Sequence, residues 1–225
     1  MTAPEVAILG LEEAARLDWR EDPSERTLRR DRRLWTAWTT WMVFVFCVPA
    51  ALLVVIEPLT FPAAAICLVH AWAIPSIQAR RGARQLVPIG GARSAAQRAG
   101  GSAAAERVAL GLLGDLLGHR ERELVAETGL ALQRGELGSW LIGEQGALLV
   151  RPGRGRVDCW CVRVGDTEGL PPGDRVAHLL LALREDELGF AKVANLGFSG
   201  AGWRVRRHLE PGARAALAAA RADQA

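Results

Sequence analysis

Two long apolar segments dominate the pattern of hydrophobic and polar positions along the chain. Residues 34–56 and 59–79 contain no Asp, Glu, Lys or Arg, and only Glu57 and Pro58 separate them. A bilayer core of about 30 Å requires roughly 20 helical residues, because each residue of an α-helix rises about 1.5 Å. Both segments are long enough. The pattern therefore predicts a two-span α-helical transmembrane hairpin over residues 34–79, with the lipid bilayer as its partner.

The charges that flank these segments predict which side of the membrane the rest of the chain occupies. Residues 1–33 form an amphipathic, arginine-rich segment, further arginines follow residue 79, and the turn carries only Glu57. Because positively charged flanks stay on the cytoplasmic side, we expect both termini to be cytoplasmic. The same charges favour contact with anionic lipid headgroups near Arg26–Arg33 and Arg80–Arg98.

Signals for local structure divide the remainder of the chain. Asp22 is the expected N-cap of a helix that starts at Pro23 and continues into the first apolar segment. Residues 80–102, rich in Gly, Ala, Ser and Arg, predict a flexible juxtamembrane linker, and residues 103–225 a cytoplasmic α+β domain. Within that domain apolar periodicity predicts a helix over 103–118, a terminal helix from Pro211, and short strands over 128–134, 137–143, 147–151, 157–164, 190–198 and 203–209. Residues 175–188 fit either a helix or a buried strand.

Composition narrows the class of protein. The chain is rich in Ala, Gly, Leu and Arg and contains a single lysine, Lys192, which is typical of a GC-rich bacterial genome and suggests a bacterial inner membrane. The formal net charge is +3, but residues 102–225 hold 16 basic and 16 acidic side chains. The basic excess therefore belongs to the membrane flanks and gives no sign of a nucleic-acid surface.

His70 is the one ionisable residue deep in the apolar segments, where such residues are functional candidates. Counted from the turn, it lies level with Val45, whose carbonyl is left without a helical donor because Pro49 has no N–H. We expect neutral His70 to make an intramembrane polar contact with that carbonyl and so join the two helices. A role in proton or metal binding is the alternative.

Two further clusters invite chemical interpretations. Cys159 and Cys161 share one face of a predicted strand, where packing in the core competes with metal or redox use. Arg204, Arg206 and His208 alternate along another predicted strand and could contact an anion, although charges on an edge strand also prevent aggregation. Phosphate-loop, dinucleotide, zinc-protease and serine-hydrolase motifs are absent from the sequence, so we expect no cofactor, no metal and no catalytic residues.

The helix that contains Glu106 and the strand pair at 137–150 make residues 103–152 resemble the nuclease-related-domain family, which shares the PD-(D/E)xK nuclease core. The resemblance implies one acid in the first strand of the pair and an acid-x-lysine at the end of the second. Here those positions are Gly138 and Arg151-Pro152-Gly153, and Glu106 is the only acid that matches. A divalent cation needs two or three carboxylates, so the resemblance implies a catalytically inactive copy.

These observations predict a membrane-anchored α+β domain that binds an unknown protein partner, acts as a scaffold or senses a signal without catalysis. The alternative is a membrane-tethered enzyme. It would be either a nuclease that uses carboxylates such as Glu136, Glu144 and Asp158, or an enzyme that depends on the thiols of Cys159 and Cys161.

Overall fold

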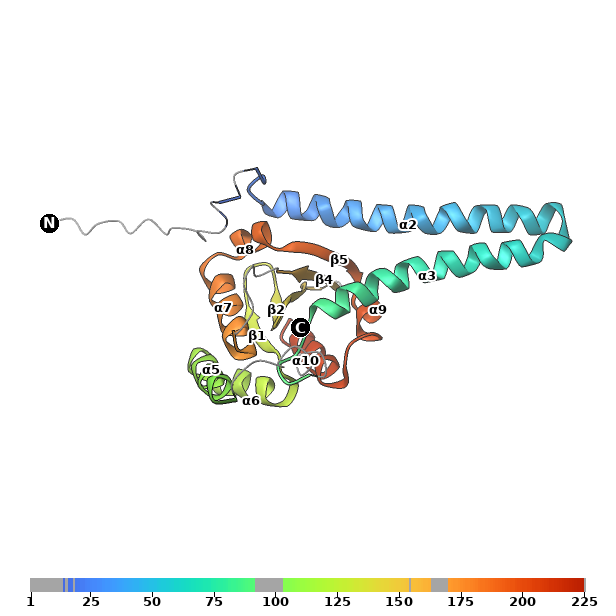
Figure 1. Ribbon diagram of the computed structural model, residues 1–225. Helices are drawn as coiled ribbons and strands as arrows, with labels where there is room; N and C mark the ends of the chain where they lie inside the picture. The colour runs from blue at the N-terminus through green and yellow to red at the C-terminus, as the bar shows by residue number, and fades with distance from the viewer. Residues whose placement is uncertain are drawn as a thin grey trace.

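The structure is a computed structural model that describes residues 14, 16, 17, 19–91, 103–153, 155–162 and 170–224 (Figure 1). It contains a long helical hairpin and a domain in which helices cover both faces of one sheet. Part of the arginine-rich segment (residues 1–13, 15 and 18), residues 92–102 of the expected linker and residues 163 and 164 of an expected strand lie outside the described residues.

The hairpin consists of α2 (Glu25–Ile56), the single 3₁₀ turn η1 (Pro58–Thr60) and α3 (Phe61–Gln85). The helix predicted to enter the first apolar segment without a break is confirmed, but its N-cap is Ser24 and not Asp22. Ser24 accepts a hydrogen bond from the Thr27 backbone N–H, and Thr27 accepts one from the Ser24 N–H, which completes a capping box. At the other end, the Thr60 hydroxyl donates to the Leu53 carbonyl at 2.8 Å and closes the turn.

Both helices of the hairpin are long and apolar enough to cross a membrane. Of their most apolar 18-residue stretches, only 6% in α2 and 17% in α3 are buried inside the protein. A core helix of a soluble domain would instead bury one face against its neighbours. The large side chains left exposed include Trp38, Phe44, Leu52, Val55, Ile66, Val69 and Trp72. An apolar surface of this extent is suited to lipid.

The α+β domain is built on a five-stranded sheet in which every neighbouring pair is antiparallel and the strands follow chain order. The strands are β1 (Ala131–Arg134), β2 (Ser139–Gly143), β3 (Gly146–Val150), β4 (Arg156–Cys161) and β5 (Asn195–Ala201). The helices are α5 (Ala103–Leu116), α6 (His119–Thr128), α7 (Pro172–Glu185), α8 (Glu187–Val193), α9 (Gly202–Arg206) and α10 (Pro211–Ala222). The predicted class, two apolar helices followed by an α+β domain, is confirmed at this level.

Each face of the sheet has its own buried cluster, because successive side chains of a strand point to opposite faces. On one face Trp140, Leu149 and Trp160 pack against α5, α7 and α8. On the other face Leu148, Cys159 and Phe198 pack against α10 and, unexpectedly, against the end of α3. Ala79 and Ala83 of α3 are 0% and 1% exposed and belong to this second cluster. The hairpin therefore contributes to the core of the domain.

Several expectations for local structure are corrected. Residues 80–91 were expected to begin a flexible linker, but α3 runs to Gln85 and the chain beyond it is buried and bonded. The Val87 carbonyl accepts the Glu144 N–H at 2.9 Å, and the Ile89 N–H donates to the Gly129 carbonyl at 2.8 Å. Residues 190–198, expected as one strand, divide between the end of α8 and the start of β5.

The open choice at 175–188 is settled by the structure. Most of this segment forms α7, whose apolar face covers Trp140 and its neighbours. Residues 203–209, predicted as a strand, instead contain α9. Gly202, Val205 and Leu209 are buried, at spacings of three and four residues, whereas Arg207 is exposed. A helix produces this pattern, but in a strand residues 205, 207 and 209 would share one face.

Candidate functional site: the junction of α2 with the sheet

Helix α2 lies beside β5 on one face of the sheet, and its side chains meet those of β4 in a regular ladder of contacts. Four residues of a helix rise about 6 Å, and two residues of a strand span about 6.6 Å, so every fourth residue of α2 meets every second residue of β4. The pairs are Leu28 with Trp160 in one buried cluster, Arg32 with Asp158 in an ion pair, and Thr36 with Arg156 in a hydrogen bond. A single face of β4 thus positions α2 through apolar, ionic and polar contacts in succession.

Asp158 is the centre of this ladder, and its side chain is fully buried. Its pairing with Leu149 of β3 places it on the face of the sheet that α2 covers. Arg32 Nε lies 3.2 Å from Asp158 Oδ2. Arg151, in the turn after β3, reaches the same carboxylate through Nε at 3.0 Å from Oδ2 and Nη2 at 3.0 Å from Oδ1. Two guanidinium groups from distant parts of the chain therefore share one carboxylate.

The buried trio carries an uncompensated positive charge, since two arginines face one aspartate. The Arg32 side chain is 9% exposed and that of Arg151 is 14% exposed. Burial lowers the pKa of Arg151, Asp158 opposes this shift, and the nearby charges of Arg32 and Arg156 lower the pKa further. Arginine stays protonated even so, and the excess charge therefore favours an anion nearby.

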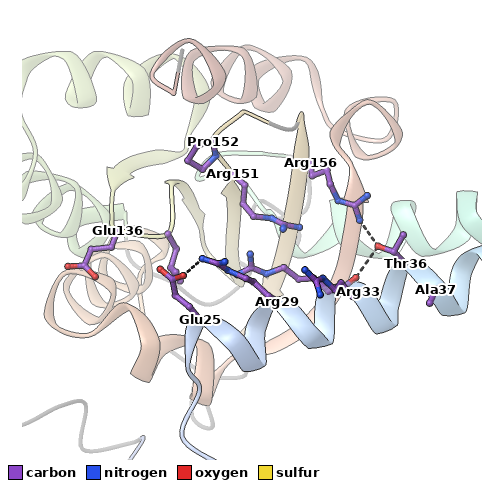
Figure 2. A pocket seen from close by; sticks show the side chains of 11 residues that line it. Glu25, Arg29, Arg33, Thr36, Ala37, Glu136, Arg151, Pro152 and Arg156 are labelled. Atoms are coloured by element: carbon purple, nitrogen blue, oxygen red, sulfur yellow. Dashed lines mark hydrogen bonds and ion pairs between the residues drawn. The ribbon is translucent and has the colours of Figure 1, made fainter.

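A cleft of about 730 Å³ opens above the trio, between α2 and the β3–β4 end of the sheet (Figure 2). Arg29 and Arg33 extend along the α2 wall, while Arg151 and Arg156 point toward them from the sheet. The lining consists of Glu25, Arg29, Arg32, Arg33, Thr36, Ala37, Glu136, Leu137, Arg151, Pro152 and Arg156. Five arginines thus face two glutamates, and with Asp158 counted as a third carboxylate the site keeps a net charge of +2.

The carboxylates proposed for a nuclease do not come together. Among the described residues, no group of three His, Cys, Asp or Glu side chains is placed to hold a metal ion. Asp158 is held by arginines, Glu136 lies at the rim of the cleft, and Glu106 is half-buried in the first turn of α5. Of the carboxylates predicted for a nuclease, Asp158 is therefore the central residue of the junction, and Glu136 lines the cleft above it.

The two cysteines of β4 differ in their surroundings. Cys159 is 1% exposed and packs in the cluster that contains Phe198, whereas Cys161 at the end of the strand is partly exposed. Burial raises the pKa of Cys159 strongly, and the adjacent negative charge of Asp158 raises it further. A thiol in such a place stays protonated and is a poor nucleophile.

His70 does not make the predicted contact with the Val45 carbonyl. Its Nδ1 atom lies 2.8 Å from the carbonyl oxygen of Ile66, one turn back in its own helix. Its ring stacks on Phe46 of α2, with ring centroids 5.4 Å apart. The histidine therefore joins the two helices through an aromatic contact, and its polar atom is bonded within α3.

Arg204, Arg206 and His208 do not line one strand face, because α9 and the turn after it replace the predicted strand. Arg204 instead lies over the ring of Trp203, with its guanidinium carbon 5.4 Å from the ring centroid, and Arg207 approaches the same ring at 4.7 Å. Trp203 is 51% exposed. The three predicted residues form no shared anion site in this arrangement.

Sequence analysis missed Arg32, Thr36, Arg151 and Arg156 as site residues. The arginines of α2 were assigned together to the membrane flank, because the sequence alone does not distinguish Arg32 from Arg33. One signal was available: Leu28, Arg32 and Thr36 recur every four residues and place an apolar, a charged and a hydroxyl side chain on one helix face. Their partners lie more than 100 residues away in the chain.

No family model, no curated protein and no solved structure matches this chain. The resemblance of residues 103–152 to the nuclease-related-domain family stays a prediction. Functional inference therefore depends on the geometry of the junction and on the chemistry of its side chains.

Proposed function

We propose that the chain is a membrane-anchored, non-catalytic binding or sensing module of a bacterial inner membrane. Residues 34–79 cross the bilayer as a hairpin, and the α+β domain and both termini are cytoplasmic. The exposed apolar surface of both helices supports the anchoring, because only a small share of either apolar stretch is buried in protein. The arginines on either side of the hairpin support the orientation.

The shared carboxylate of Asp158 is the observation that carries the sensing role. It connects Arg32, just before the apolar stretch of α2, to Arg151 beside β3. A shift of α2 in the membrane would change this ion-pair cluster, and a change at the cleft would in turn act on α2. Buried charged clusters have few alternative arrangements, which makes such a junction suited to a switch between two states.

The surroundings of Asp158 and Cys159, the groups considered for catalysis, support a non-catalytic role. Both oxygens of the Asp158 carboxylate contact guanidinium groups, so they are poorly placed to bind a divalent cation or to activate water. The Cys159 thiol is buried and protonated. Neither arrangement favours the nuclease or the thiol-dependent enzyme that the sequence left open.

Reporter fusions test the anchoring. A reporter active only in the cytoplasm should be active when fused after residue 225 and inactive when inserted at Glu57 in the turn. The chain should also remain in the membrane fraction after a high-salt wash and dissolve only in detergent. Release by salt alone, or an active cytoplasmic reporter at the turn, would overturn the proposal.

Incubation of the purified full chain in detergent with DNA or RNA and Mg²⁺ or Mn²⁺ tests the absence of catalysis. We expect no cleavage above that of a preparation from cells that lack the gene. Cleavage that Glu106→Gln abolishes, or that Asp158→Asn abolishes while the variant stays folded, would favour the enzyme instead.

A further inference from the structure

The cleft above Asp158 holds positive charge that the protein itself does not neutralise. Within the described part of the chain, the guanidinium groups of Arg33 and Arg156 form no ion pair with a carboxylate. The Arg156 guanidinium donates a hydrogen bond to the Thr36 hydroxyl, with Nη2 to Oγ1 at 2.6 Å. Arg156 is only partly exposed, so its charge is less screened by water than that of a surface arginine.

The four arginines around the opening are arranged to surround a ligand and do not form a flat patch. Arg29 and Arg33 lie one turn apart on the same side of α2, whereas Arg151 and Arg156 approach from the opposite wall (Figure 2). Planar guanidinium groups donate paired hydrogen bonds to phosphate oxygens. The volume of about 730 Å³ falls within the range of small-molecule sites and exceeds what a single inorganic ion fills.

The position of the cleft along α2 indicates where a ligand would bind relative to the membrane surface. The α2 wall comprises residues between Glu25 and Ala37, and the apolar segment starts at Leu34. Given the proposed membrane anchoring, on which this inference rests, the opening lies beside the lipid headgroups. The headgroup region adds roughly 5–7 Å on each side of the hydrocarbon core, which corresponds to about one turn of helix.

We propose that this cleft binds a phosphate-bearing small molecule, with Arg33 of α2 and Arg156 of β4 contacting the phosphate oxygens. Arg29 and Arg151 are positioning residues, because Glu25 and Asp158 already engage their guanidinium groups. The bound phosphate would connect α2 to the sheet and add to the ion pair between Arg32 and Asp158. Occupancy of the cleft is in this way communicated to the membrane helix. The phosphate belongs either to an anionic lipid or to a soluble phosphate compound.

Two double variants with the same change in charge separate the cleft from general surface attraction. Arg33→Gln with Arg156→Gln removes two charges from the cleft, and neither residue pairs with a carboxylate. Arg80→Gln with Arg81→Gln removes two exposed charges from α3 at the other side of the hairpin. The detergent-solubilised full chain is titrated with dioctanoyl phosphatidylglycerol by calorimetry, with dioctanoyl phosphatidylcholine as the lipid of zero net charge.

We expect the cleft variant to lose at least about tenfold in affinity for phosphatidylglycerol, because hydrogen bonds between charged groups are lost. The α3 variant should change by less than about twofold. Equal losses in both variants would show attraction to surface charge alone and would overturn the proposal, as would an unchanged affinity in the cleft variant. Should the cleft variant fold poorly, Arg33→Gln alone makes the test with one exposed residue of α2, and Arg81→Gln alone is then its control.

Competition with inorganic phosphate and pyrophosphate identifies the source of the phosphate. Displacement of the lipid by either anion supports a soluble ligand, and binding of the lipid without displacement supports a headgroup. The inference is overturned if the chain binds neither phosphatidylglycerol nor the two soluble phosphates. The reporter fusions remain an independent measurement: a chain that is anchored as proposed but binds no phosphate refutes only the cleft ligand, whereas a chain that is not anchored refutes the proposed function itself.

Discussion

The two helices of the hairpin pack on opposite faces of the same sheet, and the contacts that hold them there differ in chemistry. Helix α3 is attached by close apolar packing: a side chain at Gly82 would place its Cβ 2.6 Å from Phe198 Cβ and 3.2 Å from Cys159 Sγ. Helix α2 is attached through Arg32 and Thr36 to a charged and polar row on β4. Beyond the sheet the helices meet each other, where the Thr39 hydroxyl lies 3.2 Å from Gln78 Oε1.

This difference indicates which helix is fixed and which can respond. Close packing of small residues has essentially one solution, and it is insensitive to ions or ligands. An ion-pair cluster beside an open cleft responds to any anion that enters, because the charges remain strongly coupled at low dielectric. We therefore interpret α3 as the rigid connection between the hairpin and the domain, and α2 as the element whose contact with the domain is adjustable.

The largest effect should follow from loss of the charge that holds α2. Asp158→Asn leaves Arg32 and Arg151 close together and buried without their counter-charge. Breaking a buried ion pair in this way costs about 3–5 kcal/mol, so thermal unfolding in detergent should occur at a much lower temperature. The variant should also expose α2 near Arg32 to proteolysis. A stability equal to that of the wild type would mean that the cluster does not hold the helix.

Replacement of all three residues of the ion-pair cluster tests whether the α2 junction needs charge at all. A triple variant with Arg32→Met, Asp158→Leu and Arg151→Met converts the α2 junction into an apolar one like that of α3. Apolar substitutes of similar volume often match or exceed a buried ion-pair cluster in stability, by about 1–4 kcal/mol. We expect the triple variant to unfold no earlier than the wild type, although the cleft has lost its charged floor.

The α3 junction should be disturbed by a single methyl group. Gly82→Ala places a Cβ against Phe198, and because the nearest atom belongs to the start of that side chain, the helix or β5 must shift. Overpacking of this kind costs about 1–3 kcal/mol. Gly111→Ala in α5 is the matched control, since nothing lies within 4 Å of its Cβ, and there the gain in helix propensity should stabilise by about 0.5–1 kcal/mol. Opposite shifts in the unfolding temperature are the expected result.

Much of the fold could be predicted because its signals are local. The apolar segments of the hairpin and the strands near 137–143 and 147–151 follow from runs of apolar residues bounded by turns. Helix α9 was missed for an equally local reason. The alternating charges of Arg204 and Arg206 suggested a strand, and they outweighed the helical spacing of three and four residues that relates the buried Gly202, Val205 and Leu209.

The candidate site was largely hidden because its contacts are not local. Asp158 could be noticed as an acid within an apolar strand, but its partner Arg32 lies in a run of arginines with one common explanation, the membrane flank. Only the crossing of α2 over β4 turns Arg32 inward and leaves Arg29 and Arg33 at the opening. A geometry set by tertiary packing cannot be read from the charges themselves.

A smaller effect should come from the polar end of the ladder. Thr36→Val keeps the shape of the side chain but removes the acceptor for Arg156 Nη2, so the partly buried guanidinium loses a hydrogen bond worth about 1 kcal/mol. Thr40→Val, one turn further along α2, removes only a bond from an exposed hydroxyl to the Thr36 carbonyl and serves as the control. We expect the unfolding temperature to fall in the first variant alone. Equal shifts would assign the effect to the helix and not to the junction.

The smallest effect concerns Asp223, whose partners belong to β1 and β2, and it separates a general loss of stability from loss of the α2 contact. Asp223, after α10, accepts hydrogen bonds from Arg134 Nε and from the Ser139 hydroxyl at 2.8 Å, and these partners hold its pKa below the usual range, although burial opposes them. A carboxyl with a lowered folded-state pKa contributes stability above its unfolded pKa of about 3.9, and loses that contribution as the pH falls through the folded value. Asp223→Asn should therefore lower the unfolding temperature slightly at pH 7 and leave it unchanged in strong acid.

Because the Asp223 contacts lie between α10 and the β1–β2 edge, the variant should not alter the proteolysis of α2 near Arg32, whereas Asp158→Asn should. Cleavage of α2 in both variants would mean that the junction responds to global stability alone, and the proposed distinction between an adjustable α2 and a fixed α3 would fail.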